Sequence, residues 1–402
     1  MKKIRLFLFQ LLALSFALSP ALAGEIGKTD VRGYAEFSYV RDNGIGWSGS
    51  ESTFYPRVKL DVLHAVDEDA LVRVSGEWQP TVGPFSRAYG QLAAPTAQVD
   101  DTYLQFSNIA EATSLRLGSV KVPFARFDTL ALNQSARPMS SPRWREWDYG
   151  ARLDSRFSFF DFSVAVVNGE GTAGTDSNSD KSLAARIVFP AQTGEIYPET
   201  LETTNYPNPA VANPAGNFNW SFGVSGYNGT KYSTPIKQRN NHYGADLKLD
   251  YSVFSLMAEY VYMEGWFTDP SMNNATGSAL TSFSYSSAVN SLWICNNGVC
   301  SPATFQRANS VIVELTAGVS TKTLLSAMGE IYKPDIDSDV TPQQKLKQRL
   351  ALGIKHDFRK NVTGSVFYVF TYDPAFGRVG NITQSDTWKG EDVFTCGIAM
   401  AF

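Results

Sequence analysis

The stretch Phe54-Tyr-Pro-Arg-Val-Lys-Leu-Asp-Val62 alternates between apolar and polar side chains over most of its length. One face would carry Phe54, Pro56, Val58, Leu60 and Val62, and the other would carry Arg57, Lys59 and Asp61. A two-residue period is the period of a β-strand, whose successive side chains point to opposite faces of a sheet. The stretch therefore predicts an amphipathic strand with one apolar and one charged face.

The same period returns in segments of about ten residues along most of the chain. No later segment approaches the ~20 consecutive apolar residues that a membrane-spanning helix needs. We expect an all-β protein with about sixteen antiparallel strands. The expected strands lie near residues 31–40, 54–64, 70–79, 101–107, 114–122, 147–154, 157–167, 182–189, 217–227, 243–251, 254–264, 310–319, 324–332, 347–356, 362–371 and 392–402.

Three features favour a transmembrane β-barrel over a soluble sandwich. The connections alternate between short and long, which is the layout of barrels with turns on one side of a membrane and loops on the other. Aromatic residues stand near the ends of the apolar faces, as in interfacial girdles. The chain also ends on FTCGIAMAF, a strand that resembles the last strand of outer-membrane proteins. The Pro-rich stretch 190–216 fits less well, because its position in the alternation predicts a short turn.

The first residues indicate export. Lys2, Lys3 and Arg5 precede an apolar run that closes on Ala21-Leu22-Ala23, the pattern of a cleaved signal peptide. We expect residues 1–23 to be removed and residues 24–402 to form one barrel domain. Cleavage lowers the basic count from 35 to 32 against 39 acidic residues, for a formal charge of −7.

Two short motifs carry a resemblance to a known family. LRLGSVKVPFAR, residues 115–126, is similar to the segment of the phosphate-selective porin O/P group that leads from a strand into the inward-folding third loop. VVNGEG, from Val166, is similar to a strand end common in porins. The resemblance implies a trimer of sixteen-stranded barrels in the outer membrane of a Gram-negative bacterium. It also implies that residues 123–146 fold into the lumen.

The sequence favours no cofactor, metal or catalytic chemistry. Gly169, Gly171 and Gly174 match G-x-G-x-x-G, but the polar run TDSNSDK follows them where a dinucleotide site needs a helix. His64, His242 and His356 are far apart and lack any metal-ligand spacing, and no nucleophile elbow is present. We expect neither an enzyme nor a nucleic-acid partner.

The expected activity is passive diffusion of small hydrophilic solutes and ions through a water-filled lumen, with a modest preference for anions. The alternative is a receptor or sleeve that holds a partner protein such as a multihaem cytochrome, which needs no internal constriction. Outer-membrane lipid and lipopolysaccharide are the expected surroundings, and a homotrimer is the expected assembly.

The anion preference is assigned to basic residues at the expected constriction. Because low-dielectric walls focus the field inside a pore, local charge should outweigh the net negative charge of the chain. The residues are Arg57, Lys59, Arg73, Arg116, Arg126, Arg137, Arg143, Arg145 and Arg152. The competing interpretation is that these residues pair with wall acids such as Asp61, Glu77, Asp148 and Asp154 and only brace the loop.

Two of the three cysteines are expected to form a disulfide. Cys295 and Cys300 flank Asn296-Asn-Gly-Val299 in a long polar loop, residues 265–308, and Asn-Gly favours a tight reversal of the chain. Export places the pair in an oxidising compartment. Cys396 falls on the apolar face of the last strand and is expected to stay free.

Overall fold

The computed structural model describes the strands and part of their connections. The described residues are 29–42, 51–79, 96–99, 102–125, 147–169, 180–190, 216–233, 236–265, 280–286, 291–296, 299–302, 306–336, 347–359, 361–372 and 393–401. In this part of the chain no helix is long and apolar enough to cross a membrane.

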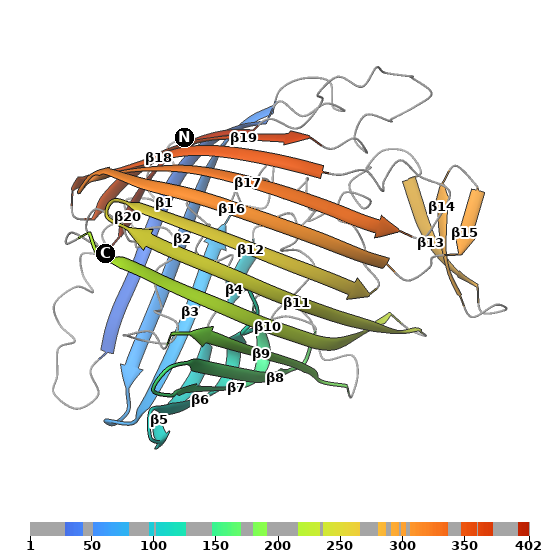
Figure 1. Cartoon of the computed structure of the whole chain (residues 1–402), viewed down its shortest axis with the longest axis horizontal. Coiled ribbons are helices and arrows are strands. Elements are labelled where there is room, and N and C mark those ends of the chain that lie inside the picture. Colours follow the sequence, from blue (N-terminus) through green and yellow to red (C-terminus); the bar gives the residue numbers. More distant parts are fainter. Residues whose placement is uncertain are drawn as a thin grey trace, which may run out of the picture.

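The main sheet is a closed antiparallel barrel with sixteen strand positions (Figure 1). Its strands are β1 (Thr29–Asp42), β2 (Glu51–Ala65), β3 (Ala70–Gln79), β4 (Thr96–Val99), β5 (Thr102–Ala110), β6 (Thr113–Lys121), β7 (Trp147–Arg156), β8 (Asp161–Val167), β9 (Ser182–Phe189), β10 (Phe218–Ser233), β11 (Ile236–Tyr251), β12 (Phe254–Gly265), β16 (Gln306–Ser320), β17 (Thr323–Ile336), β18 (Lys347–Arg359), β19 (Val362–Tyr372) and β20 (Val393–Ala401). The short β4 shares one position with β5, because both pair with β3 at different points along its length.

Two ladders show that the ring closes. β1 pairs with β20, which joins the two ends of the chain, and β9 pairs with β10, which joins the two halves. The register of the strand pairs defines a stagger. A path that follows paired residues once around the ring returns to its first strand about 20 residues from its start. This stagger corresponds to strands tilted by roughly 40° from the barrel axis. The expected even-numbered antiparallel barrel is confirmed.

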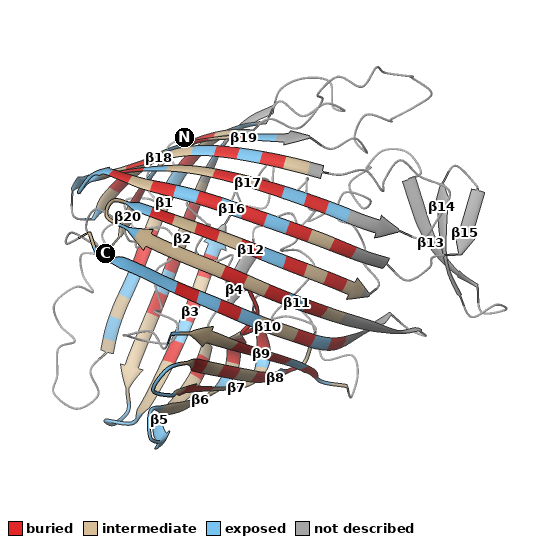
Figure 2. Cartoon of the chain, viewed as in Figure 1, coloured by how far each residue is buried: buried red, intermediate tan, exposed pale blue. Residues whose placement is uncertain are grey.

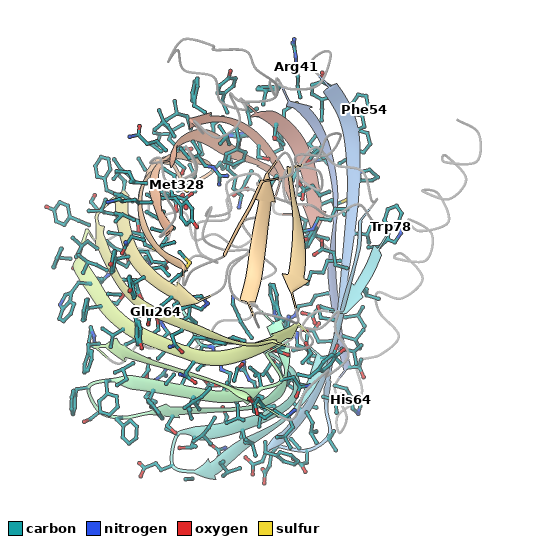
Figure 3. All side chains as sticks on the ribbon, turned by 90° about the vertical axis from the view of Figure 1, so that its right-hand side faces the viewer. Arg41, Phe54, His64, Trp78, Glu264 and Met328 are labelled. Atoms are coloured by element: carbon teal, nitrogen blue, oxygen red, sulfur yellow. The ribbon has the colours of Figure 1, made fainter. Side chains whose placement is uncertain are left out.

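The two faces of the wall differ as the sequence pattern predicts. On β16, Val311, Val313 and Leu315 are exposed, whereas Ile312 and Glu314 between them are buried. The same alternation of exposed and buried residues runs along β10, β17 and β18 (Figure 2). In the view along the barrel, Phe54 and Trp78 lie on the outer rim (Figure 3). Since a β-sheet satisfies all its backbone groups in lipid only when it closes into a barrel, this closed sheet with its apolar outer band places the protein in the outer membrane.

Several strand boundaries differ from the expectation. The connection expected at residues 228–242 is mostly strand, because β10 and β11 extend until only residues 234 and 235 separate them. The strand expected to begin at Phe157 begins at Asp161, because the amide of Phe157 donates to the carbonyl of Phe160 in a tight turn. The two-residue period does not predict these strand ends. The extended ends of β10 and β11 carry polar side chains on both faces, and the turn before β8 is rich in phenylalanine.

The long loop 265–308 contains a separate three-stranded sheet. It consists of β13 (Leu280–Ser286), β14 (Ser291–Asn296) and β15 (Val299–Pro302), and it shares no ladder with the barrel. Three other expected features fall outside the described residues: the signal peptide 1–23, residues 126–146 of the third loop, and 191–215 of the Pro-rich stretch.

Candidate pore constriction

The third loop starts where β6 loses the regular strand conformation. Gly118 has a φ of 137°, which residues with a side chain rarely adopt. A Cβ atom at this position would lie 2.4 Å from the carbonyl oxygen of Thr102 on β5, so only glycine fits the close approach of the two strands. Beyond Gly118, Val120 and Val122 are almost fully buried. The glycine that the sequence motif contained therefore marks an irregular point in β6, three residues before the strand ends at Lys121.

The next residues reach β10 and β11. The amide of Ala125 donates to the hydroxyl of Ser225 on β10, with 3.1 Å between nitrogen and oxygen. The ring of Phe124 lies 5.9 Å from the imidazole of His242 on β11. The Cβ of a residue in place of Gly244 would come within 3.5 Å of the Phe124 ring. Because β7, β8 and β9 separate β6 from β10 in the ring, these contacts are made across the lumen.

The far end of the loop contacts β2. Trp147, the first residue of β7, pairs in register with Lys121, the last residue of β6. The ammonium of Lys121 lies 5.5 Å from the centroid of the Trp147 ring, and the ammonium of Lys59 on β2 lies 6.0 Å from the same centroid. We call Lys121–Ala125 together with Trp147 the lumenal bridge. Because β2 and β11 stand on opposite sides of the ring, the bridge has contacts on both sides of the lumen.

The sequence-predicted arginines on the wall are held by carboxylates. Arg57 donates to Glu77 through Nε and Nη2, at 2.5 and 2.6 Å. Arg73 forms the same two-pronged contact with Asp61, at 2.7 and 2.6 Å. All four side chains are buried. Such paired bonds between a planar guanidinium and a carboxylate fix the positions of both groups.

Arg152 and Arg116 are the other two predicted arginines that lie in the described part of the chain. Arg152 donates to Asp154 at 2.7 Å and to the carbonyl of Lys121 at 2.9 Å, which anchors the start of the bridge. Arg116 donates to the amide oxygen of Gln105 and lies 5.0 Å from the ring centroid of Tyr103. The structure thus brings Arg57, Lys59, Arg73, Arg116 and Arg152 to the inner face of neighbouring strands. Arg126, Arg137, Arg143 and Arg145 lie outside the described residues.

The structure adds an ion pair that sequence reasoning missed. Arg186 on β9 reaches over β10 to Asp246 on β11, with 2.7 Å between nitrogen and oxygen. It can do so because Gly223 lies between them, where a Cβ would meet both charged groups at 2.5 Å. A glycine between inward polar residues is the only sequence signal for this contact, and it is not specific.

A different surface covers the inner face of β12, β16 and β17. Its buried side chains include six large apolar ones, three of them methionines: Met257, Val261, Met263, Ile312, Met328 and Tyr332. The same strands also bury Glu259 and Glu330. Glu314 stands among them, opposite Met257 and Met328 in the two neighbouring ladders. One of its oxygens accepts from Ser326 at 2.7 Å, and the other has no hydrogen-bond partner.

The three histidines lie on three separate strands. His64 on β2 and His356 on β18 each bond a threonine hydroxyl, those of Thr29 and Thr323, at 2.9 Å. His242 stacks on the ring of Tyr227, with 5.5 Å between the ring centroids, and the ring of Phe124 lies 5.9 Å away at a tilt of 57°. Among the residues that the structure describes, no three metal-ligating groups come together.

Comparison with solved structures identifies the architecture. No family model matches the chain, and a search of curated proteins finds no match. The fold is that of the Gram-negative outer-membrane porins. The DcaP channel of Acinetobacter baumannii has a TM-score of 0.60 at 11% identity, over 96% of this chain and 100% of that one. The anion-selective porin of Comamonas acidovorans has a TM-score of 0.58 at 11% identity, over 94% and 100%. OmpF of Salmonella typhi has a TM-score of 0.54 at 12% identity, over 94% of this chain and 98% of that one. At these identities the similarity establishes the fold.

Proposed function

We propose that the protein is a porin, a passive channel for small hydrophilic solutes and ions across the outer membrane of a Gram-negative bacterium. The observation that carries the proposal is the lumenal bridge inside a sixteen-stranded barrel. Barrels of this size enclose an aqueous lumen unless something fills it. A segment that contacts both sides narrows the lumen, which gives a diffusion channel its size limit. A sleeve for a partner protein needs an open lumen, so the bridge favours the channel.

The proposed assembly is a homotrimer in contact with outer-membrane lipid and lipopolysaccharide. A trimeric form of OmpT from Vibrio cholerae has the same fold, with a TM-score of 0.52. The exposed apolar band on the outer wall supplies the surface that lipid or a second subunit would cover.

A modest anion preference is the finer part of the proposal. Arg57, Arg73 and Arg152 each have a carboxylate partner, so they contribute little net field. The preference therefore rests on Lys59, Arg116 and the loop arginines Arg126, Arg137, Arg143 and Arg145. One of the porins with this fold is described as anion-selective, which supports the preference without establishing it.

Conductance in planar lipid bilayers tests both parts. The purified protein should produce stable conductance steps without any partner, whereas a sleeve would stay silent. In a KCl gradient, the zero-current potential should indicate anion preference. Replacing Arg137, Arg143 and Arg145 with Glu should shift that potential toward cations. Cation selectivity in the unaltered protein, or no shift in the variant, would refute the anion preference and leave the channel intact.

A further inference from the structure

We propose that the outer face of β5, β6 and β7 is the side on which each barrel packs against a second copy of this chain. This inference rests on the proposed homotrimer and assigns its contact surface. Phe106 and Leu117 on this face are 36% and 40% exposed, whereas Tyr103 and Arg152 on the same strands are buried and face the lumen. We call the surface the low face and define it by its apolar side chains: Leu104, Phe106, Leu115, Leu117, Ala151 and Leu153.

The low face belongs to a short part of the wall. β6 and β7 have 9 and 10 residues, whereas β16, on the opposite side of the ring, has 15 (Figure 1). The pairing of β5, β6 and β7 arranges the apolar side chains of the low face in two rows. One row is Leu104, Leu117 and Ala151, and the other is Phe106, Leu115 and Leu153.

Polar side chains bound both rows. The next row toward the third loop is Thr102, Ser119 and Tyr149, which all carry a hydroxyl group. Beyond the other row, Thr113 and Ser155 share a hydrogen bond between their hydroxyls at 3.1 Å. No charged residue occupies an outward position between Thr113 and Ser119 on β6 or between Tyr149 and Ser155 on β7. The low face thus has an uncharged apolar centre and a rim of hydroxyls.

The height of this apolar band can be compared with that of β16. Alternate residues of a strand are ~6.8 Å apart, which is about 5 Å along the barrel axis at a tilt of roughly 40°. The two rows of the low face therefore cover about 10 Å of that axis. The outward side chains of β16 cover about 25 Å, the usual height of the apolar band, and they are Val311, Val313, Leu315, Ala317 and Val319.

Lipid fits the tall side of the barrel and not the low face. A bilayer adapts to a short apolar surface by thinning, at a cost that rises with every ångström of mismatch. At the low face it would have to thin to less than half of its apolar thickness. A protein surface needs no such match, because protein interfaces combine an apolar centre with a polar rim, as the low face does.

The symmetry of the proposed trimer identifies the partner as a second copy. In a closed ring of identical subunits, every subunit turns the same side toward the symmetry axis. On that side neighbouring subunits, and not lipid, surround the wall. The low face is the part of this wall with the poorest match to lipid, so we place it toward the axis.

Spin labels measure what covers the low face. In a background with Cys295, Cys300 and Cys396 replaced by serine, Leu117→Cys places a nitroxide on the low face. Val313→Cys, on the exposed side of β16, is the matched control. In vesicles that contain only the purified protein, dissolved oxygen should relax the Leu117→Cys label several-fold less than the Val313→Cys label, because oxygen concentrates in lipid. Only Leu117→Cys should show dipolar broadening from labels on other copies, and dilution with unlabelled chain should remove it.

A second pair of variants tests the same face without labels. Phe106→Ala removes an aromatic side chain from the low face and should raise the concentration at which trimers dissociate in detergent by at least tenfold. Phe254→Ala, on the exposed side of β12, should leave that concentration unchanged. Mass photometry measures the fraction of trimers in both variants.

The outcomes separate the interface from the channel. Equal oxygen relaxation at both labelled positions, without broadening, would show that lipid covers the low face and would overturn the proposal. Trimers that dissociate equally readily in Phe106→Ala and Phe254→Ala would also overturn it. An unaltered protein that conducts as a monomer would refute the interface and leave the channel intact. Broadening at Leu117→Cys in a protein without conductance would support the interface and refute only the channel.

Discussion

The inner faces of β2, β3 and β7 and of β12, β16 and β17 belong to one ring and follow one alternation, yet their chemistry differs. The first is a layer of arginine–carboxylate pairs beside two lysines, and the second mixes methionines and other apolar side chains with the glutamates Glu259, Glu314 and Glu330. The membrane dictates only the outer face, which is apolar on both sides of the ring. The inner face is therefore where this barrel specifies its function.

Breaking an ion pair in the first region should have the largest effect. Arg57→Met leaves the buried carboxylate of Glu77 without its partner, which should lower the free energy of unfolding by about 3–5 kcal/mol. Urea unfolding in lipid vesicles, followed by tryptophan fluorescence, measures the change. The double variant Arg57→Met, Glu77→Met removes both charges and should recover most of the loss. A double variant as unstable as the single one would show that packing, and not charge, is the cause.

A smaller loss is expected at Gly223 on β10, which lies between the two regions in the ring. Gly223→Val places a side chain between Arg186 and Asp246, where a Cβ meets both at 2.5 Å, and should cost about 1–3 kcal/mol. Gly226→Val is the matched control, because a Cβ there has no atom within 4 Å. The cost should largely vanish when Arg186 and Asp246 are both replaced with Met. An equal cost in that background would mean that the glycine is required for another reason.

The second region should respond to loss of a carboxyl group with the opposite sign. Glu314→Gln keeps the shape and removes a buried carboxyl group that has one oxygen without a partner, so the protein should gain about 1 kcal/mol. Glu77→Gln, the same substitution in the first region, should instead destabilise it. The same unfolding measurement compares the two variants. If Glu314→Gln destabilised the barrel as much as Glu77→Gln, the two inner faces would not differ in the way that we describe.

The comparison also explains which features the sequence could predict. Alternation such as that of Phe54–Val62 follows from lipid outside and polar groups inside, so the barrel, its strand parity and the inward direction of Arg57 and Arg73 were predictable. On β12, Met257, Val261 and Met263 face inward together with Glu259, so the pattern weakens where apolar side chains also line the lumen.

The contacts of the candidate site could not be predicted from the alternation of side chains. The meeting of Lys59 with Trp147 depends on the path of the loop across the lumen and not on any period in the chain. The pairing of Arg57 and Arg73 with acids depends on register between strands, which is set by turns and bulges as well as by the alternation.

The smallest effect on the barrel is expected from the disulfide. Cys295 and Cys300 are opposite each other in the ladder of β14 and β15, and their side chains lie outside the described residues. Opposite residues in an antiparallel pair have Cβ atoms about 4.5–5.5 Å apart, a little beyond the usual 3.5–4.5 Å of a disulfide, so a small adjustment suffices. We therefore expect both thiols to resist alkylation until a reductant is added. Because β13–β15 share no ladder with the barrel, reduction should leave the unfolding midpoint unchanged. Cys396, a free cysteine on β20, is the internal control, since its alkylation on unfolding should not depend on reductant. Mass spectrometry that found Cys396 bridged, or a midpoint that fell on reduction, would contradict the separation of this hairpin from the barrel.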